Sequence, residues 1–382
     1  MATQKTPGIQ KAFLFMPDIT GFTEFVNSNE IMHAQNIIKE LLEIIIESNQ
    51  LDLKVSEIEG DAVFFYRIGN APSMNQLLEQ IQTMFTRFHQ HLQLYDHQRI
   101  CPCGACSSSK NLKLKVFAHF GEVTGVSIKE HRTLFGKDVI VLHRLLKNSL
   151  HKKEYALFTK HLLQDAQPLH STPSWYEFED ASEQYDVGTI NFTVADLSRL
   201  HDEMPPVTPP AYHLYKKTKP VFSHEQLIPF PIAQVFTPIF DLSQRPNWMD
   251  GVDKVEIVGH DHINRVGTKH CCIVHGENDS FIVTNYAKIE SGIMELIEMD
   301  EKGMGGLSFH LEQVSDNETL VKIDLLIRNN PIILLYYHLL MKSKLQKRII
   351  QGLNNLAELC RHAAVVESDP AGGRTGSQII SD

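Results

Sequence analysis

The chain has 382 residues, a length that favours two domains of roughly 150 to 200 residues each. Its 36 basic and 46 acidic side chains give a net charge of −10, which argues against binding to nucleic acid or to anionic membranes. The N-terminus lacks an apolar signal core, and the longest apolar run, residues 331–341, is too short for a membrane span, so we expect a cytoplasmic protein. Six cysteines in such a chain do not predict a disulfide framework.

Hydrophobic spacing in the first half of the chain alternates between the periods of strands and of helices. The strand-like runs cover residues 12–17, 53–58, 62–68, 112–119 and 122–128. The helix-like runs cover residues 31–46, 74–92 and 137–150. The resulting order, β-α-β-β-α-β, predicts an α+β domain over residues 1–200, with a ferredoxin-like sheet that carries its helices on one face.

A proline-rich segment, residues 201–220, predicts a linker to a second domain over residues 221–365. A strand at 221–228, a short helix at 231–240 and a run of β segments from 252 to 328 are expected there. The pair Asn330-Pro331 predicts the start of one long helix that ends near residue 364. Residues 366–382 are rich in Gly and Ser and predict a disordered tail.

Two carboxylates, Asp18 and Asp61, stand where an apolar strand meets a glycine turn. Taken singly, Asp18 is typical of a helix N-cap and Asp61 of a two-residue hairpin turn at Gly60-Asp61. Brought together by neighbouring strands, they would suit a pair of divalent ions that hold a triphosphate.

Four segments in this half resemble the motifs of class III adenylate/guanylate cyclases. Residues 18–23, Asp-Ile-Thr-Gly-Phe-Thr, resemble the opening motif, and residues 57–62, Glu-Ile-Glu-Gly-Asp-Ala, resemble the second metal motif. Residues 119–123, His-Phe-Gly-Glu-Val, and residues 135–144, Phe-Gly-Lys-Asp-Val-Ile-Val-Leu-His-Arg, are similar to two further motifs. The resemblance covers roughly residues 10–165.

The resemblance implies a nucleotide site shared by two copies of the chain. In that family the aspartates, here Asp18 and Asp61, hold two Mg²⁺ or Mn²⁺ ions, and the 3′-oxygen of the ribose attacks the α-phosphorus. Arg144 would face the triphosphate from the partner subunit of a homodimer. The residues placed at the phosphates or at the purine base are Ile19, Thr20, Gly21, Phe22, Glu57 and Thr133.

One position departs from the family pattern, because Ile140 stands where an asparagine orients the ribose. An isoleucine side chain cannot make that hydrogen bond. Two functions therefore stay open: a cyclase, or a catalytically degenerate nucleotide sensor. Glu57 and Thr133 match different base specificities, so the choice between ATP and GTP stays open as well.

A cysteine-rich insertion near residues 97–110 interrupts the cyclase-like pattern. The thiols of Cys101, Cys103 and Cys106 lie within six residues and can converge on one soft metal ion, most simply a structural Zn²⁺. His97 is one candidate for a fourth ligand. An iron–sulfur cluster, redox-sensing thiols or a plain reduced loop fit the same spacing.

The second half resembles the START-like domains of the polyketide cyclase/dehydrase type (SRPBCC), in which a curved sheet grips a long C-terminal helix. The similarity begins at residues 228–236, Ile-Pro-Phe-Pro-Ile-Ala-Gln-Val-Phe, and at residues 248–252, Trp-Met-Asp-Gly-Val. It implies an apolar cavity for a lipid or another apolar small molecule, which would control the first domain or be the main ligand. The polar residues considered for that pocket are His270, His275, Glu277 and Asn285. The order of the two domains also resembles that of uncharacterised bacterial proteins.

Overall fold

The computed structural model describes residues 8–28, 31–101, 103–128, 131–169, 173–208, 214–258, 264–274 and 277–368. These residues form two compact units. Unit 1 contains the described residues up to Thr208, and unit 2 contains those that follow, together with residues 98–101. His275 and residues 209–213 of the predicted linker lie outside the described residues, as does the predicted tail beyond Ser368.

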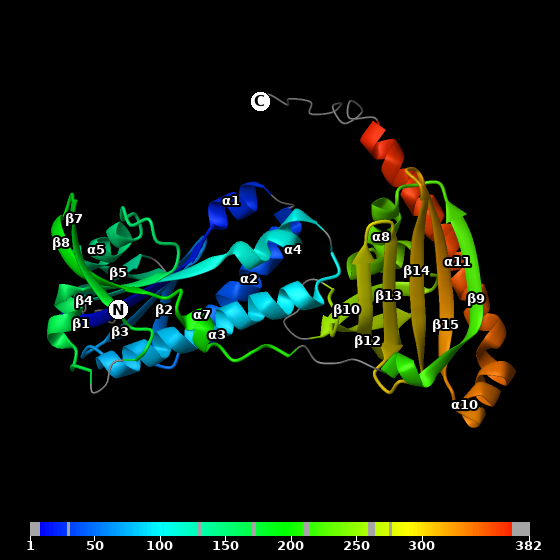
Figure 1. Ribbon diagram of the computed structural model, residues 1–382, viewed down its shortest axis with the longest axis horizontal. Helices are drawn as coiled ribbons and strands as arrows, with labels where there is room; N and C mark the ends of the chain where they lie inside the picture. Colours follow the sequence, from blue (N-terminus) through cyan, green and yellow to red (C-terminus); the bar gives the residue numbers. More distant parts are fainter. Residues whose placement is uncertain are drawn as a thin grey trace, which may run out of the picture. The chain divides into compact units, whose positions relative to one another are not determined.

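Unit 1 is built on an eight-stranded sheet in which seven strands follow the order β2-β3-β1-β4-β6-β8-β7, and β5 pairs with β4 (Figure 1). The pair β4/β6 is parallel and the other pairs are antiparallel. The strands are β1 (Gln10–Thr20), β2 (Lys54–Glu59), β3 (Ala62–Ile68), β4 (Lys113–Ile128), β5 (His131–Phe135), β6 (Tyr155–Thr159), β7 (Phe178–Tyr185) and β8 (Gly188–Asp196). The predicted mixture of helices and strands is confirmed.

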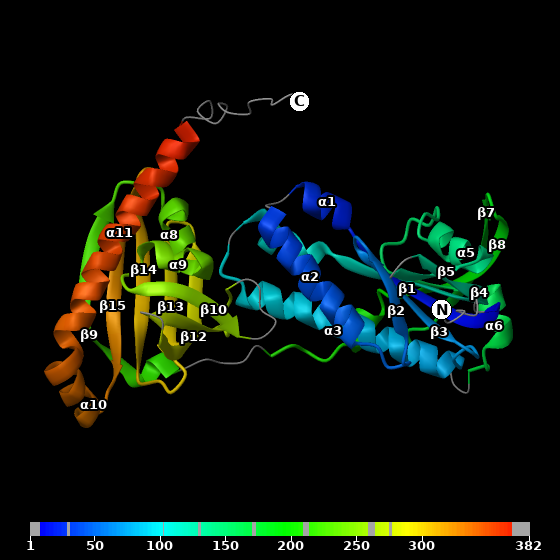
Figure 2. The same ribbon diagram turned by 180° about the vertical axis from the view of Figure 1, so that it is seen from behind.

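The helices of unit 1 cover both faces of the sheet. Two long helices, α2 and α3, run side by side along the sheet (Figures 1 and 2). On the other face, Leu142 and Leu145 of α5 pack with Leu14, Phe64 and Phe117 in one buried cluster. The expectation of helices on one face alone was therefore wrong. The helices are α1 (Phe22–Asn27), α2 (Ile31–Glu47), α3 (Met74–Gln98), α4 (Gly104–Ser108), α5 (Lys137–Leu145), α6 (Lys160–Asp165) and α7 (Leu200–Glu203).

Strand β4 is continuous through Gly121, where the sequence predicted a break between two strands. A Cβ atom at residue 121 would lie 2.2 Å from Cγ of Asp138, so this glycine is required for the close approach of α5 rather than for a turn. Asp138 in turn accepts a hydrogen bond from the backbone N–H of Glu122, at 2.6 Å. The segments 119–123 and 135–144, which resemble two of the cyclase motifs, thus meet at this contact.

Unit 2 is a seven-stranded antiparallel sheet in the order β10-β11-β12-β13-β14-β15-β9, with the long helix α11 (Lys342–Ser368) lying across one face (Figure 2). Strand β9, the first in the chain, pairs with β15, the last. The strands are β9 (Thr218–Ile228), β10 (Val252–Val258), β11 (Lys269–Val274), β12 (Glu277–Glu290), β13 (Ile293–Asp300), β14 (Gly305–Ser315) and β15 (Glu318–Arg328). Two short helices, α8 (Ile232–Phe240) and α9 (Arg245–Trp248), precede β10.

The predicted C-terminal helix begins where expected, because the side chain of Asn330 caps the backbone N–H groups of Ile332 and Ile333. It is interrupted, however, by a π-helical turn at Tyr337–Met341, which separates α10 (Pro331–Tyr336) from α11. Hydrophobic spacing cannot reveal such a turn, since it inserts one residue without changing the composition. Within the described chain, no helix is both long enough and apolar enough to cross a bilayer.

Candidate functional site

The structure brings Asp18 and Asp61 together at one corner of the sheet in unit 1. Asp18 lies near the end of β1, opposite Ala62 at the start of the antiparallel strand β3. Asp61 is the second residue of the Gly60-Asp61 turn, and Gly60 has φ +63°, as the first position of a type II′ turn requires. The backbone N–H of Ile19 donates to the carbonyl of Asp61 at 3.1 Å, so the turn is tied directly to β1.

Burial of these carboxylates raises both of their pKa values. The pKa of Asp18 rises from 3.8 to about 7, mainly because burial disfavours the charged form and also because Asp61 is close. Burial raises the pKa of Asp61 as well, against a backbone hydrogen bond that lowers it. If no positive charge is near, ionising both carboxylates at neutral pH costs free energy. A bound cation would remove this cost, and such a pair is therefore typical of a cation site.

Lys115 is a site residue that the sequence analysis missed. It lies on β4 directly opposite Asp18, and its charge lowers the pKa of Asp18 against the two effects that raise it. Its Nζ also lies 5.3 Å from the centre of the Tyr155 ring, a cation–π distance. The lysine therefore offsets part of the negative charge at this corner. Only the register of β1 against β4 reveals it, since nothing in the local sequence distinguishes Lys115.

The segment after Asp18 offers fewer phosphate contacts than the resemblance implies. The N–H of Ile19 is already used by Asp61, and Gly21, with φ +92°, precedes a helix α1 of only six residues. The hydroxyl of Thr20, in contrast, is buried and has no hydrogen-bond partner among the described residues. Phe22 lies against the hairpin, since a Cβ atom on Gly60 would be 3.9 Å from its ring. Thr20 is thus the residue of this segment with unused hydrogen-bonding capacity.

The two residues considered for base recognition lie on different strands. Glu57 is on β2, where its carboxylate is 4.0 Å from Nε2 of His143, and Nδ1 of that histidine is 3.4 Å from Glu59. Burial and the neighbouring Glu59 raise the pKa of Glu57. Thr133 lies on β5, opposite Val126 of β4. The structure thus places Glu57 in an acidic group with His143, a partner that the sequence analysis did not consider.

Helix α5 carries both Arg144 and Ile140. The guanidinium of Arg144 makes a two-pronged ion pair with Asp186, with Nε and Nη2 at 2.8 and 2.7 Å from the two carboxylate oxygens. This partner within the same chain was not expected for a residue predicted to face a triphosphate. Ile140 is 43% exposed on the same helix. An exposed isoleucine fills no core position, so packing does not explain its presence there.

His119, part of the third motif, is fully buried and joins β4 to two other elements. Its Nδ1 lies 2.7 Å from the hydroxyl of Thr159, and its Nε2 lies 3.0 Å from Oδ1 of Asp138. The hydrogen bond with His119 helps to lower the pKa of Asp138 against the effect of burial. These contacts give His119 a structural role in holding α5 on the sheet.

The cysteine-rich insertion forms α4 and places two of its thiols against α2. Nδ1 of His33, on α2, lies 3.3 Å from Sγ of Cys103 and 3.5 Å from Sγ of Cys106. Cys101 is buried and precedes Cys103 by two residues in the chain. His97, the ligand that the sequence suggested, is exposed, whereas His33 lies 70 residues away from Cys103 in the sequence.

Unit 2 encloses a cavity of about 370 Å³ between the sheet and α11. Most of its lining is apolar and comes from β14, β15 and α11, with Phe309, Ile323 and Ile349 as examples. The polar part of the lining includes Arg245 and Glu298. A cavity of this size and character is within the range of small-molecule sites.

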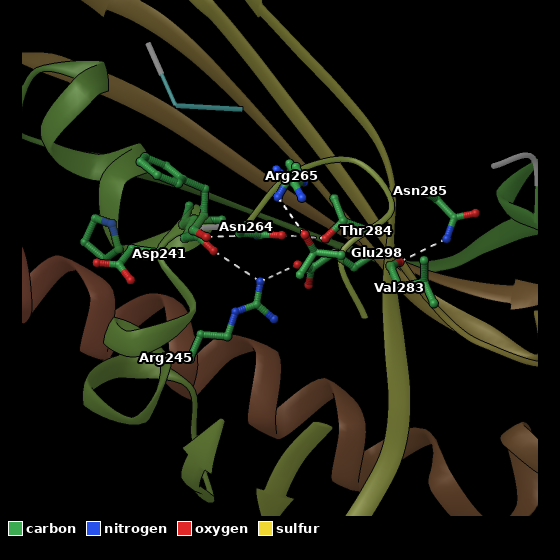
Figure 3. A network of polar contacts seen from close by, with 12 residues as sticks. Asp241, Arg245, Asn264, Arg265, Val283, Thr284, Asn285 and Glu298 are labelled. Atoms are coloured by element: carbon green, nitrogen blue, oxygen red, sulfur yellow. Dashed lines mark hydrogen bonds and ion pairs between the residues drawn. The ribbon is translucent and has the colours of Figure 1, made fainter. Parts of the chain in front are cut away.

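Arg245 and Glu298 form a fully buried ion pair at 2.6 Å (Figure 3). Nη2 of Arg245 also donates to the carbonyl of Ile239 at 3.1 Å. Beside this pair, Asn264 bridges Thr284 and the carbonyl of Phe240 (Figure 3). A buried ion pair is costly unless further hydrogen bonds support it, and the carbonyl of Ile239 provides one such bond to Arg245.

Two of the polar residues considered for the pocket, His270 and Asn285, do not line the cavity. His270 is buried, and burial lowers its pKa to about 4, so the ring is neutral at physiological pH. Asn285 is buried and donates to the carbonyl of Val283 at 2.9 Å, turned away from Arg245 in Figure 3. Neither residue is part of the cavity lining, and nothing is described of the Glu277 side chain. The pocket assignment of His270 and Asn285 was therefore wrong.

Comparison with known sequences places the chain in a family. The family model described as a protein of unknown function, DUF2652, matches residues 38–155. The uncharacterized protein Rv2561/Rv2562 of Mycobacterium tuberculosis is 31% identical over 173 residues, which are 44% of this chain and 77% of that protein. The chain belongs to the same family as this mycobacterial protein.

Comparison with solved structures finds adenylyl and guanylyl cyclase domains. A bacterial light-regulated adenylyl cyclase is 15% identical with a TM-score of 0.38; the match covers 53% of this chain and 58% of the cyclase. The adenylyl cyclase CyaB of P. aeruginosa is 14% identical with a TM-score of 0.33, covering 50% of this chain and 97% of that one. Norcoclaurine synthase of Thalictrum flavum is 14% identical with a TM-score of 0.31, covering 38% and 96%. Similarities this low do not by themselves assign an activity, which has to be argued from the residues.

The raised pKa of Asp18 predicts a pH-dependent effect of Asp18→Asn on stability. The carboxyl binds its proton more tightly in the folded protein, so wild-type stability falls as pH rises from about 4 to 7. The substitution removes this loss: we expect no gain near pH 4, and a gain of about 1–3 kcal/mol in the free energy of unfolding at pH 8, since the full shift is worth roughly 4 kcal/mol.

The measurement uses the two tryptophans of the chain, one in each unit. In a Trp248→Phe background, the fluorescence of Trp175 reports denaturant unfolding of unit 1 at each pH. A loss of stability in Asp18→Asn at pH 8 would show instead that Lys115 stabilises the Asp18 carboxylate more than burial opposes it.

Proposed function

We infer that unit 1 binds a purine nucleoside triphosphate together with Mg²⁺ or Mn²⁺ at the corner formed by Asp18 and Asp61. The observation that carries this proposal is the pair itself: one carboxylate on β1 and one in the turn before the neighbouring strand β3. Burial raises both pKa values, and Asp61 also raises that of Asp18. Such a pair gains most from a bound cation, because the cation removes the repulsion between the two charges.

The donors at this corner fit a hard divalent cation. Carboxylate oxygens are the preferred ligands of Mg²⁺ and Mn²⁺, and the unsatisfied hydroxyl of Thr20 follows Asp18 by two residues. Lys115 adds a positive charge beside Asp18. This charge supports phosphate binding, and it also reduces the need for a second metal ion.

In this proposal Asp18 and Asp61 hold the metal, and Thr20 donates to a phosphate oxygen. A bound divalent ion would neutralise phosphate charge and polarise the reacting oxygens. The remaining members of the site, Gly21 and Phe22, would shape the corner, and Ile19 would act by fixing the turn through its N–H. Glu57 and Thr133 would face the base.

Binding without efficient turnover is the form of this function that the residues support best. Ile140, which stands where the cyclase resemblance expects a ribose-orienting asparagine, has an apolar side chain, and Arg144 is held by Asp186 in its own chain. A homodimer in which Arg144 reaches the partner's triphosphate would have to break that ion pair first. A nucleotide sensor needs neither an oriented ribose nor a release of Arg144 from Asp186. We therefore propose a sensor, and cyclic nucleotide formation is the competing outcome.

Nucleotide binding is tested by thermal unfolding of the full chain with ATP or GTP and either metal. At a nucleotide concentration ten times the Kd we expect about 1.4 kcal/mol of stabilisation, which raises Tm by about 3–6 °C. The metal-dependent part of the shift should be lost in Asp18→Ala and in Asp61→Ala and retained in Asp165→Ala, which alters an exposed carboxylate of α6.

Two results of this experiment would change the account. If neither nucleotide shifts Tm at millimolar concentration with either metal, the nucleotide proposal is wrong. If chromatography of the same mixtures detects cyclic nucleotide that is absent from the Asp18→Ala sample, the protein is a cyclase rather than a sensor.

A second function is favoured by the cavity in unit 2. We propose that it binds a lipid or another apolar small molecule whose polar end meets the Arg245–Glu298 pair. The apolar lining and the volume of about 370 Å³ support an apolar ligand, and the buried ion pair supplies a single polar region inside the site.

The segment α10 with the π-helical turn supports this reading, because it lies at the cavity and is apolar on both sides. Ile333, Tyr337 and Met341 contribute to the lining. Ile332 and Leu339, from the same segment, are 78% and 72% exposed. π-Helical turns occur often at functional sites, and an apolar surface beside a cavity suits the entry of an apolar ligand.

A matched pair of substitutions on α11 tests the cavity. Ile349 lines it, whereas the adjacent Ile350 does not and is partly exposed. We expect Ile349→Phe to weaken the binding of a fluorescent fatty acid by about fivefold or more, the equivalent of about 1 kcal/mol of overpacking. Ile350→Phe should leave binding unchanged. Equal affinities in both variants, with Tm preserved, would place the fatty acid outside the cavity.

A further inference from the structure

A cluster of soft metal ligands lies in unit 1, apart from the proposed nucleotide site. Its centre is His33, whose Nδ1 is 3.3 Å from Sγ of Cys103 and 3.5 Å from Sγ of Cys106. The ligand atoms of these three residues all lie within 4.8 Å of one another. They come from α2 and from α4 with its N-cap, two helices that are neighbours in the structure.

The distances match a tetrahedral zinc site. With Zn–S bonds of about 2.3 Å and a Zn–N bond of about 2.0 Å, tetrahedral angles place a thiolate sulfur about 3.5 Å from an imidazole nitrogen. Both observed S···N distances are within about 0.2 Å of that value. The cluster therefore has the dimensions of a metal site.

The surrounding contacts orient the two thiols. Sγ of Cys103 accepts from the backbone N–H of Cys106 at 3.4 Å, which fixes one thiol relative to the other. The hydroxyl of Tyr95 lies 3.1 Å from Sγ of Cys106, from the adjacent helix α3. Hydrogen bonds to the sulfur of a metal-bound cysteine are typical neighbours of such a site.

We propose that His33, Cys103 and Cys106 bind a structural Zn²⁺, with Cys101 as the fourth ligand. Cys101 is buried and separated from Cys103 by one residue, so chain connectivity alone keeps the two Cα atoms within about 7 Å of each other. Three thiolates and one imidazole form the Cys₃His set of many structural zinc sites.

Three other groups of potential ligands are less suited to zinc. They are His89, Glu154 and His201; His119, Asp138 and His161; and Glu57, Glu59 and His143. In the first group Nζ of Lys113 already lies 3.6 Å from Glu154 and would repel a metal ion. In the second, His119 is held by Thr159, and in the third both glutamates are exposed. None of the three contains a thiol, the donor that Zn²⁺ prefers in structural sites.

The zinc would fix the insertion next to the start of α1. Leu112 follows the insertion by two residues, and its side chain would lie 3.8 Å from a Cβ atom on Gly21. A metal that links the insertion to α2 would thus also restrain the corner after Asp18. Zinc loss should therefore loosen this part of unit 1, whether or not a nucleotide binds there.

The proposal is tested on the full purified chain by its metal content and by substitution with Co²⁺. We expect about one zinc per chain by elemental analysis. The Co²⁺ form should show sulfur-to-metal charge transfer together with tetrahedral d–d bands. Those charge-transfer bands require thiolate ligands, so they distinguish this cluster from the three thiol-free groups.

Variants of single residues locate the ion. Cys103→Ser and Cys106→Ser should lose the zinc and the cobalt spectrum, and Cys101→Ser and His33→Ala should weaken binding at least tenfold in competition with a chelator. Cys360→Ser, a buried cysteine of unit 2, is the control and should retain the zinc. If a cysteine variant fails to fold, chelator removal of zinc from the wild type, followed by Co²⁺ titration, gives the same answer.

Three results would overturn the proposal. The first is a purified chain, kept reduced, that contains no zinc and gives no tetrahedral cobalt spectrum. The second is zinc retained at full occupancy in both Cys103→Ser and Cys106→Ser. The third is a cobalt spectrum without charge transfer from sulfur.

Discussion

The burial of two neighbouring carboxylates, Asp18 and Asp61, is the constraint on which unit 1 depends. Strand pairing forces Asp18 and Asp61 into one corner, and the hydrogen bond from Ile19 to Asp61 prevents the turn from moving away. Burial raises the pKa of Asp18 to about 7, so the corner is tolerable only if a carboxyl is protonated or a positive charge is near. Lys115 provides part of that charge, and a divalent ion would provide the rest.

The surrounding fold holds this corner rigidly. The middle of strand β1, residues 12–17, is buried between two packed faces. Helix α5 is fixed on the sheet through Asp138, which contacts both His119 and the strand at Gly121. These contacts give a structural reason for His119, Gly121 and Asp138, which belong to two of the cyclase-like motifs. They do not require these residues to take part in a reaction. In unit 2 the buried Arg245 is likewise held by an opposite charge, that of Glu298, and its Nη2 also donates to the carbonyl of Ile239.

Local patterns in the sequence predicted most of the elements. The helix expected at 31–46 is observed at Ile31–Glu47, and the Gly60-Asp61 turn follows from the conformational freedom of glycine. Features that depend on tertiary contacts were missed. Gly121 was taken for a strand break because its reason, the approach of Asp138, lies 17 residues further along the chain. Lys115 and His33 acquire their partners only through strand register and helix packing, and the π-helical turn leaves no compositional signal.

The central claim is that Asp18 and Asp61 together hold a divalent cation with a nucleotide. The most direct measurement is anomalous diffraction from crystals grown with Mn²⁺ and a non-hydrolysable purine nucleoside triphosphate. The account predicts a manganese peak in contact with a carboxylate oxygen of each aspartate and with the phosphates. Nucleotide density elsewhere, or a corner in which Nζ of Lys115 alone bridges the two carboxylates, would contradict it.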